Sequence, residues 1–244
     1  MIKQKDIDDK SICLIGLDIG TSAIKGVLVR ADGKVLAEAG TETAFLHPEE
    51  GQVEIEPEQH YGNVCGVIRR LTASAPCGVT ALSMAAASGN TLLTDSEARP
   101  LGNIISWMDQ RAAQQAPKSL AGISSAELAR ICGWPCLDSF PMAHLAWLRE
   151  NSSEIYYGAG HYGMDTDWLI FRLTGKWVMD HSTASTFHLQ EQVSGNYHLK
   201  FLDLLDIPMK KLSPLVPSAL AVGSLLPQAL RDTGLSPETI LVSG

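Results

Sequence analysis

The sequence predicts an α/β domain built on a mixed sheet, with a three-stranded antiparallel meander at its N-terminus and flanking helices. Two short apolar runs joined by a polar turn occupy residues 14–30, and bounded runs rich in Ile, Leu and Val indicate buried strands. The pair Asp32-Gly33 marks a tight turn, so residues 35–43 follow as a third strand. Residues 57–71 then show the helical spacing of apolar side chains that packs a helix against a sheet.

The later elements rest on similar local signals. Pro57 lies near the first turn of the predicted helix, with acidic residues beside it that suit the positive end of the helix dipole. Residues 79–84 predict another buried strand, and a turn after it leads into a strand that ends near Asp95. Ser124 and Glu127 have the spacing of a capping box. Residues 117–160 and 195–208 are predicted to be helical. Residues 240–244 are predicted to be extended.

The composition limits the class of protein. A chain of 244 residues with 45% hydrophobic and 19% charged residues is long enough for one large domain or two small ones. The net charge of -8 argues against a nucleic-acid partner, which would require a basic face. No apolar run approaches the ~20 residues of a membrane helix, and the first ten residues lack the apolar core of a signal peptide.

The cysteines indicate the compartment. The five cysteines form no CxxC pair, so the sequence predicts buried free thiols and neither a disulfide framework nor a zinc site. The gap between Cys132 and Cys136 is also wrong for a redox motif. We therefore expect a cytoplasmic protein in a reducing environment.

The turn of the first hairpin carries the candidate phosphate site. Gly20 lets backbone N–H groups come close to a ligand, Thr21 and Ser22 supply hydroxyl groups, and Asp18 would hold Mg²⁺ through water. Lys25 adds a compact positive charge if it points back along the hairpin. The spacing matches neither a P-loop nor a dinucleotide-binding loop. The alternative is an ordinary hairpin with a polar turn.

Three motifs resemble one family. The pattern Asp-x-Gly-Thr-(x)3-Lys at residues 18–25 resembles the first phosphate motif of the actin-like ATPase superfamily, and of the FGGY carbohydrate kinases in particular. Residues 100–111 resemble the family pattern Pro-Leu-x-x-x-Ile-x-Trp-x-Asp-x-Arg, and residues 167–185 resemble its Leu-Thr-Gly and Asp-x-Ser-x-Ala-Ser block. The resemblance covers residues 12–244 and implies a ribonuclease H-like, actin-like ATPase fold.

The resemblance also implies a sugar pocket. An indole beside an acid–base pair can offer an apolar wall and fixed polar groups to a polyol, so Trp107, Asp109 and Arg111 are candidate substrate-binding residues. The family commonly has Gln and His, or Arg and Glu, in the preceding turn, where this chain offers only Ser88 and Asn90 as hydrogen-bonding groups. The alternatives are that Trp107 is a core residue and that Asp109 and Arg111 form a structural pair.

The third motif yields a local expectation as well. A helix is predicted to stop at Gly175, a good C-terminal capping residue. We expect a strand to follow, with the Asp-x-Ser-x-Ala-Ser residues on its surface. The resemblance assigns this region to the sugar-side wall, and a purely structural scaffold is the alternative.

The activity implied by the resemblance is ATP- and Mg²⁺-dependent phosphoryl transfer to a sugar or polyol hydroxyl, with a xylulose-type ketose favoured. The family's general base, an Asp, would lie beyond Gly244, so no catalytic residue is assigned within this chain. We expect an N-terminal extension (1–11), a sugar-side domain (12–239) and the start of a strand leading into a missing C-terminal kinase domain (240–244).

The partners expected from this interpretation are a small-molecule sugar or polyol, the missing domain and, as one option, a second copy in a homodimer. Neither nucleic acid nor membrane is expected as a partner. The fragment alone should have little activity, because positioning and electrostatic stabilisation both need the closed site. Two alternatives stay open: a non-catalytic sugar-binding or regulatory remnant, and a different actin-like ATPase such as a chaperone-type nucleotide-binding domain.

Overall fold

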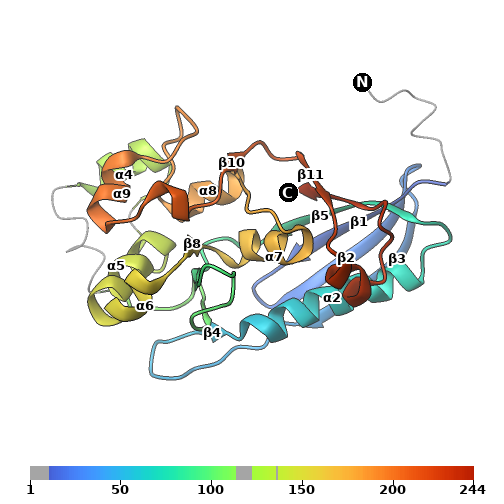
Figure 1. The fold of residues 1–244 in the computed structure, drawn as a ribbon, viewed down its shortest axis with the longest axis horizontal. Helices are drawn as coiled ribbons and strands as arrows, with labels where there is room; N and C mark the ends of the chain where they lie inside the picture. The colour runs from blue at the N-terminus through green and yellow to red at the C-terminus, as the bar shows by residue number, and fades with distance from the viewer. Residues whose placement is uncertain (1–10, 114–122, 136) are drawn as a thin grey trace.

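A six-stranded mixed sheet forms one side of the molecule (Figure 1). The computed structural model describes residues 11–113, 123–135 and 137–244. The first three strands are an antiparallel meander, and β5 and β12 run parallel to β1. The prediction of a mixed sheet with an N-terminal meander is therefore confirmed. In spatial order the strands are β11 (Ala221–Ser224), β12 (Ile240–Ser243), β5 (Val79–Ala86), β1 (Cys13–Ile19), β2 (Ala23–Arg30) and β3 (Val35–Glu42).

Helix α2 (Pro57–Ala73) lies along this sheet and supplies most of its cover (Figure 1). The helix comes especially close at Gly26, where an added Cβ would lie 2.7 Å from side-chain atoms of both Leu17 and Leu71. Each fully buried aliphatic side chain contributes about 1.5–3 kcal/mol relative to exposure, so this interface anchors β1 and β2. The predicted apolar positions of the helix are all buried: Tyr61, Val64, Val67, Ile68 and Leu71.

A second, largely helical region adjoins the sheet and has its own core of aromatic and aliphatic side chains, among them Tyr156, Tyr162, Phe187 and Phe201. Helix α7 (Asp165–Thr174) lies between the two regions and packs against α10 (Pro227–Thr233) (Figure 1). The other helices are α4 (Ser125–Cys132), α5 (Pro141–Asn151), α6 (Ser153–Gly158), α8 (His181–Phe187), α9 (Leu199–Leu205) and the 3-10 turn at Met209–Lys211.

Three two-stranded ribbons connect the regions and hold the loops that carry polar side chains. The ribbon of β4 and β7 fixes the start of α2 beside the segment that contains Trp107. The pairs are β4 (Glu54–Ile55) with β7 (Ile104–Ile105), β6 (Leu92–Thr94) with β8 (His161–Gly163), and β9 (Met179–Asp180) with β10 (Leu215–Val216).

One local prediction is wrong. Helix α7 does end at Gly175, which has a φ of 75°, but the segment after it forms only the short strand β9 and then the helix α8. Asp180 is the N-cap of α8 and accepts hydrogen bonds from the backbone N–H groups of Ser182 at 2.9 Å and Thr183 at 3.2 Å. An acidic N-cap overrides the weak strand preference of the Ser and Thr residues that follow.

Other predictions are confirmed or fall outside the described residues. Ser124 caps α4 as predicted, accepting a hydrogen bond from the Glu127 N–H. Four cysteines are free thiols, three of them buried. Within the described ranges no helix is long and apolar enough to cross a membrane. Three predictions lie outside those ranges: most of the N-terminal extension (1–10), the start of the helical region (117–122) and the Cys136 thiol.

Candidate functional site

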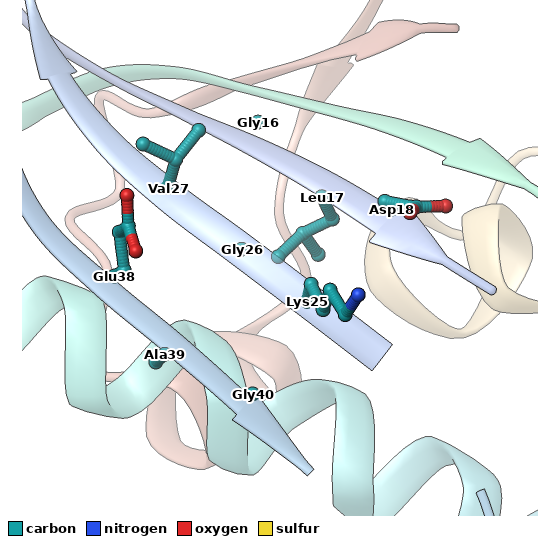
Figure 2. Close-up of a pocket in the computed structure, with 9 residues that line it drawn as sticks. All are labelled: Gly16, Leu17, Asp18, Lys25, Gly26, Val27, Glu38, Ala39 and Gly40. Carbon is teal, nitrogen blue, oxygen red and sulfur yellow. The ribbon is translucent and has the colours of Figure 1, made fainter. Parts of the chain in front are cut away.

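Asp18 and Lys25 lie opposite each other on β1 and β2, at the end of the hairpin next to its turn. Both side chains are exposed, and Figure 2 shows them on the same side of the two strands. In the part of the chain that the structure describes, neither side chain is engaged in a hydrogen bond or ion pair. The carboxylate and the ammonium group are therefore both available to a ligand.

The turn between these strands requires glycine. The Gly20 N–H donates to the Ala23 carbonyl at 3.0 Å, and a Cβ at this position would lie 2.9 Å from that same oxygen. Thr43 Oγ1 donates to the Gly20 carbonyl at 3.2 Å and holds the turn against the end of β3. Ser22 remains exposed at the tip. Hydrogen bonds thus hold the backbone of the turn, while the Ser22 side chain at its tip is exposed to solvent.

An open depression of about 700 Å³ runs from this end of the hairpin across β1, β2 and β3 (Figure 2). Small residues make its floor, including Gly16 and Gly40. The charged groups of Asp18 and Lys25 stand at one end, and Glu38 on the edge strand lies toward the other, opposite Val27. Its size matches a small-molecule cleft. The depression lies on the sheet face opposite the one buried by α2, since Leu17 and Gly26 alternate with these residues.

Trp107 joins the phosphate loop to the rest of the candidate site. Its indole Nε1 donates a hydrogen bond to Thr21 Oγ1 at 3.0 Å, which leaves the Thr21 hydroxyl hydrogen free to donate elsewhere. The side chain is 37% exposed, so Trp107 is not a core residue. Gly89 makes this position possible, because a Cβ there would lie 3.0 Å from the Trp107 Cβ.

Asn90 holds the backbone of Trp107 from the buried side. The Trp107 N–H donates to Asn90 Oδ1 at 3.1 Å, and Asn90 Nδ2 donates to Asp165 Oδ2 at 2.8 Å. Asn90 and Asp165 are 5% and 1% exposed. A buried amide with both ends bonded has one orientation, so Asp165 at the start of α7 determines which way Asn90 presents its oxygen.

His60 completes this buried polar cluster from α2. Its Nε2 lies 3.6 Å from Asp165 Oδ2, which is too far for a direct hydrogen bond. Both His60 Nε2 and Asp165 Oδ1 are buried without a hydrogen-bond partner. A cavity of about 10 Å³ adjoins them and is also lined by Gly20, Thr21 and Trp107.

Asp109 and Arg111 face inward. Asp109 is fully buried and accepts four hydrogen bonds of 2.7–2.9 Å, one from the Val53 N–H and three from the backbone and guanidinium of Arg111. Arg111 also donates to Glu54 Oε1 at 2.6 Å and lies over the ring of Trp147. Burial opposes the charge of Arg111, but the bonds to Asp109 and Glu54 outweigh it and raise the pKa of the guanidinium. Asp109 is not open to a ligand, whereas Arg111 also lines a cavity of about 210 Å³ on the side of Trp147. The contacts between the two side chains favour the structural-pair alternative.

The structure therefore divides the predicted site residues. It brings Asp18, Gly20, Thr21, Ser22 and Lys25 together around one turn, and Trp107 joins them through Thr21. Ser88 is half-buried in the turn before Asn90. Asn90 supports Trp107, while Asp109 and Arg111 brace the segment that follows it.

Sequence reasoning missed His60 and Asp165. His60 precedes Val64 by four residues and so lies on the buried stripe of α2, a signal that the periodicity contained. Asp165 and Asp167 both occupy the first turn of α7. Only Asp167 bonds the Met164 N–H at the helix start, at 2.7 Å, and no sequence pattern indicated that Asp165 would meet Asn90.

Nearly the whole chain matches one family model. Residues 13–244 match the model described as "FGGY family of carbohydrate kinases, N-terminal domain". The chain belongs to this family. The predicted family membership is confirmed, and the alternative of a chaperone-type ATPase domain is excluded.

Curated FGGY relatives differ in the substrate that their names state. The chain is 25% identical to a gluconokinase and 26% identical to a xylulose kinase, both of Bacillus subtilis, over 95% of its length. It is 30% identical to a glycerol kinase of Gloeobacter violaceus over 91% of its length. The alignments cover 45%, 47% and 45% of those relatives, so the chain spans about half their length.

Solved structures of FGGY kinases share the fold. A gluconate kinase and a ligand-bound xylulose kinase, both of Lactobacillus acidophilus, superpose with TM-scores of 0.90 at 24% identity. Each superposition covers 95% of this chain and 48% of the other. The predicted actin-like ATPase fold is confirmed.

The metal requirement of such kinases fits a single carboxylate. The described residues contain no cluster of three or more His, Cys, Asp or Glu side chains suited to a metal ion. Mg²⁺ is usually held by one or two carboxylates, by waters and by the substrate phosphates themselves. Asp18, exposed beside the turn, suits that arrangement.

Proposed function

We propose that this domain forms the sugar-side half of an ATP-dependent carbohydrate kinase that phosphorylates a hydroxyl group of a sugar or polyol. The observation that supports this most directly is the hydrogen bond from the Trp107 indole to Thr21, because it joins a candidate sugar wall to a candidate phosphate loop. A kinase must hold its acceptor and its phosphate within reach of each other.

In this proposal the hairpin residues hold the phosphate end of ATP. The Lys25 ammonium neutralises charge on the transferring group, and the Thr21 hydroxyl donates to one of its oxygens. Asp18 orients Mg²⁺ through water, and the metal when bound neutralises phosphate charge. The exposed carboxylate and ammonium fit these tasks, since no neighbouring group occupies them among the described residues.

The acceptor hydroxyl lies, in this proposal, against Trp107 and the turn that contains Ser88. Asn90 acts through Trp107 as a positioning residue, and Asp109 with Arg111 keeps the segment in place. A xylulose-type ketose is the favoured acceptor on the family resemblance. The general base and the adenosine site come from the half of the kinase that this chain does not match in its relatives.

The test is a binding and turnover experiment on the 244-residue chain. A thermal-shift panel of ketoses and polyols should raise the unfolding temperature for at least one sugar by mass action, and Trp107→Ala should abolish that shift. A coupled ATP/ADP assay with the same sugars should show little or no turnover.

The two results separate the hypotheses. Ordinary turnover by this chain alone would show that the half-site interpretation is wrong. A sugar-dependent shift that persists without turnover, even when the matching half from a relative is added, would favour the non-catalytic binder. The cytoplasmic location and the homodimer stay predictions.

A further inference from the structure

A small cavity lies between the phosphate loop and the buried cluster behind Trp107. Its volume is about 10 Å³, and its walls include Thr21, Asn90, Trp107, His60 and Asp165. A cavity of this size holds one water-sized group when two or more polar partners surround it. It shares Gly20, Thr21, Asn90 and the partly exposed Trp107 with the candidate site.

Two atoms at this cavity lack partners. Asp165 Oδ1 and His60 Nε2 are both buried without a hydrogen bond, in side chains that are 1% and 3% exposed. Buried polar atoms in native proteins are almost always paired, so an unpaired one indicates a bound group. The 3.6 Å gap between His60 Nε2 and Asp165 Oδ2 leaves the pair without a direct bond and open to a bridging one.

The chemistry of these atoms selects the group that can fill the cavity. An ionised carboxylate only accepts hydrogen bonds, so its unpaired oxygen needs a donor. A hydroxyl donates to Asp165 and uses its oxygen toward the histidine ring. The carboxylate of a sugar acid cannot donate, and two like charges repel strongly where water is excluded.

We propose that Asp165 and His60 form a subsite for one hydroxyl group of the acceptor, which makes this domain selective for neutral polyhydroxyl compounds over sugar acids. The inference rests on the proposed function and adds the substrate class. In the free protein one water occupies the subsite, and a substrate hydroxyl replaces it. Asp165 is then specificity-determining, in addition to orienting Asn90.

The test uses two ligands that differ at one end alone, where xylitol has a CH₂OH group and xylonate has a carboxylate. Titration of the full chain is followed by NMR through the Trp107 indole N–H, assigned with Trp107→Phe. We expect xylitol to bind at least about tenfold more tightly than xylonate, and Asp165→Asn to reduce this ratio to about threefold or less. Asparagine keeps an oxygen that can accept from Asn90, so the cluster retains its internal bond.

Two further variants serve as a control and as a second probe of the cavity. Asp167→Asn removes another buried carboxylate from the same helical turn, one that bonds His161 and Ser213 instead, and should leave the ratio unchanged. His60→Gln alters the same cavity from α2 and should weaken xylitol binding. Equal binding of xylitol and xylonate by the unmodified chain would overturn the subsite while leaving the proposed function intact. Perturbation by neither ligand would overturn the sugar site itself, and with it both proposals.

An independent observation concerns two cysteines at the far end of β1. The sulfur atoms of Cys13 and Cys77 lie 2.9 Å apart. Cys13 is the first residue of β1 and is fully buried, whereas Cys77 lies before β5 and is partly exposed. Because β1 and β5 pair in parallel there, the backbone already holds the two thiols together.

We infer that Cys13 and Cys77 are a site of reversible oxidation to a disulfide, with a peroxide as the oxidant. The Cys77 sulfur attacks the peroxide O–O bond, becoming a sulfenic acid and releasing one water. The Cys13 sulfur then attacks Cys77, the S–S bond forms, and the hydroxyl leaves as a second water with the Cys13 proton. Two thiols lose two electrons and the peroxide gains them.

Burial of Cys13 limits the rate at which its sulfur attacks Cys77. It raises the pKa of the Cys13 thiol to about 11, so little thiolate is present at pH 7. The rate of disulfide formation should therefore increase between pH 7 and pH 9, as the thiolate fraction grows.

Peptide mapping tests this site. Peroxide-treated chain, unfolded and alkylated, should yield a Cys13–Cys77 cross-linked peptide that dithiothreitol removes. Cys132→Ser should still form it, and Cys77→Ser should leave Cys13 open to alkylation. Oxidation should also raise the urea midpoint of unfolding, since the cross-link restricts the unfolded chain. Full alkylation of both residues, or an equal yield of cross-link from chain already unfolded in urea, would overturn the inference.

Discussion

Two acid–base pairs near the candidate site consist of similar residues, but one is exposed to solvent and the other is buried. Asp18 and Lys25 face each other across a hairpin, exposed and without partners among the described residues. Asp109 and Arg111 are buried, and four hydrogen bonds saturate the carboxylate. The charges of the exposed pair are available to a ligand, whereas those of the buried pair stabilise the fold. Burial and the number of partners, more than residue type, decide which role a charged pair has.

The largest effect expected from this comparison is on stability. Asp109→Ala leaves the Val53 N–H buried without a partner and leaves Arg111 with Glu54 as its remaining carboxylate partner. Breaking a buried ion pair costs about 3–5 kcal/mol. Urea unfolding followed by circular dichroism measures this loss. Asp18→Ala is the matched control and should leave the midpoint unchanged. Similar midpoints for the two variants would contradict the division between the pairs.

The next largest effect concerns the link between the buried cluster and Trp107. Asn90→Leu keeps the branched shape of the side chain but leaves the Asp165 carboxylate and the Trp107 N–H without their partners. Each loss of a buried partner costs about 1–3 kcal/mol, so unfolding should become easier by roughly 2–4 kcal/mol. Trp107 should also become more exposed, with a red-shifted emission relative to a background of the four other tryptophans. An unchanged emission would show that Asn90 does not hold the indole.

Two buried histidines, His144 and His188, should make the stability of the fold depend on pH. Burial lowers the pKa of His144 and of His188 to about 4, below the value of about 6.5 in an unfolded chain. The unfolded state therefore binds more protons between these values. Stability from the neutral rings is present above pH 6.5 and is lost as the pH falls toward 4.

Urea midpoints at pH 7, 5.5 and 4.5 measure this slope. His188→Asn should flatten the fall, because that position then has no group to protonate. A slope that is unchanged in His188→Asn and in an equivalent variant of His144 would place the titration elsewhere, for instance at the exposed carboxylates.

The smallest effect on stability is expected at Lys25. Lys25→Ala should leave the unfolding midpoint unchanged and weaken binding of a Mg²⁺–nucleotide by about tenfold, the size of one lost charge-assisted contact. Isothermal titration at low and high salt measures the affinity. Lys34→Ala, in the turn after β2, is the control and should bind as the unmodified chain does. A Lys25→Ala variant of unchanged affinity would remove Lys25 from the phosphate site.

The sequence predicted the elements whose signals are local and repeated. The meander, helix α2 and the cap at Ser124 follow from alternation, helical spacing and capping chemistry. The segment after Gly175 was predicted as a strand, because Ser and Thr favour strands weakly and the Asp180 cap carried too little weight.

The site was predictable only in part, for a different physical reason. Asp18, Thr21 and Lys25 lie within one hairpin, so their proximity follows from the chain itself. His60, Asn90 and Asp165 come from a helix, a turn and another helix start, and only tertiary packing brings them together. The inward orientation of Asp109 depends on Val53, and that of Arg111 on Glu54, both more than fifty positions earlier.

The position of β12 has a practical consequence for joining this domain to other sequences. The strand lies between β11 and β5, and Ser243 pairs with Met84 while Ala85 pairs with Asp18. A cut at residue 240 would divide the sheet and expose an edge of β5. A peptide tag fused after Gly244 would emerge at the same end of the sheet as Asp18, with β5 between them, and would crowd the phosphate loop. A tag placed before Cys13 would start at the opposite end of the same strand and leave the loop accessible.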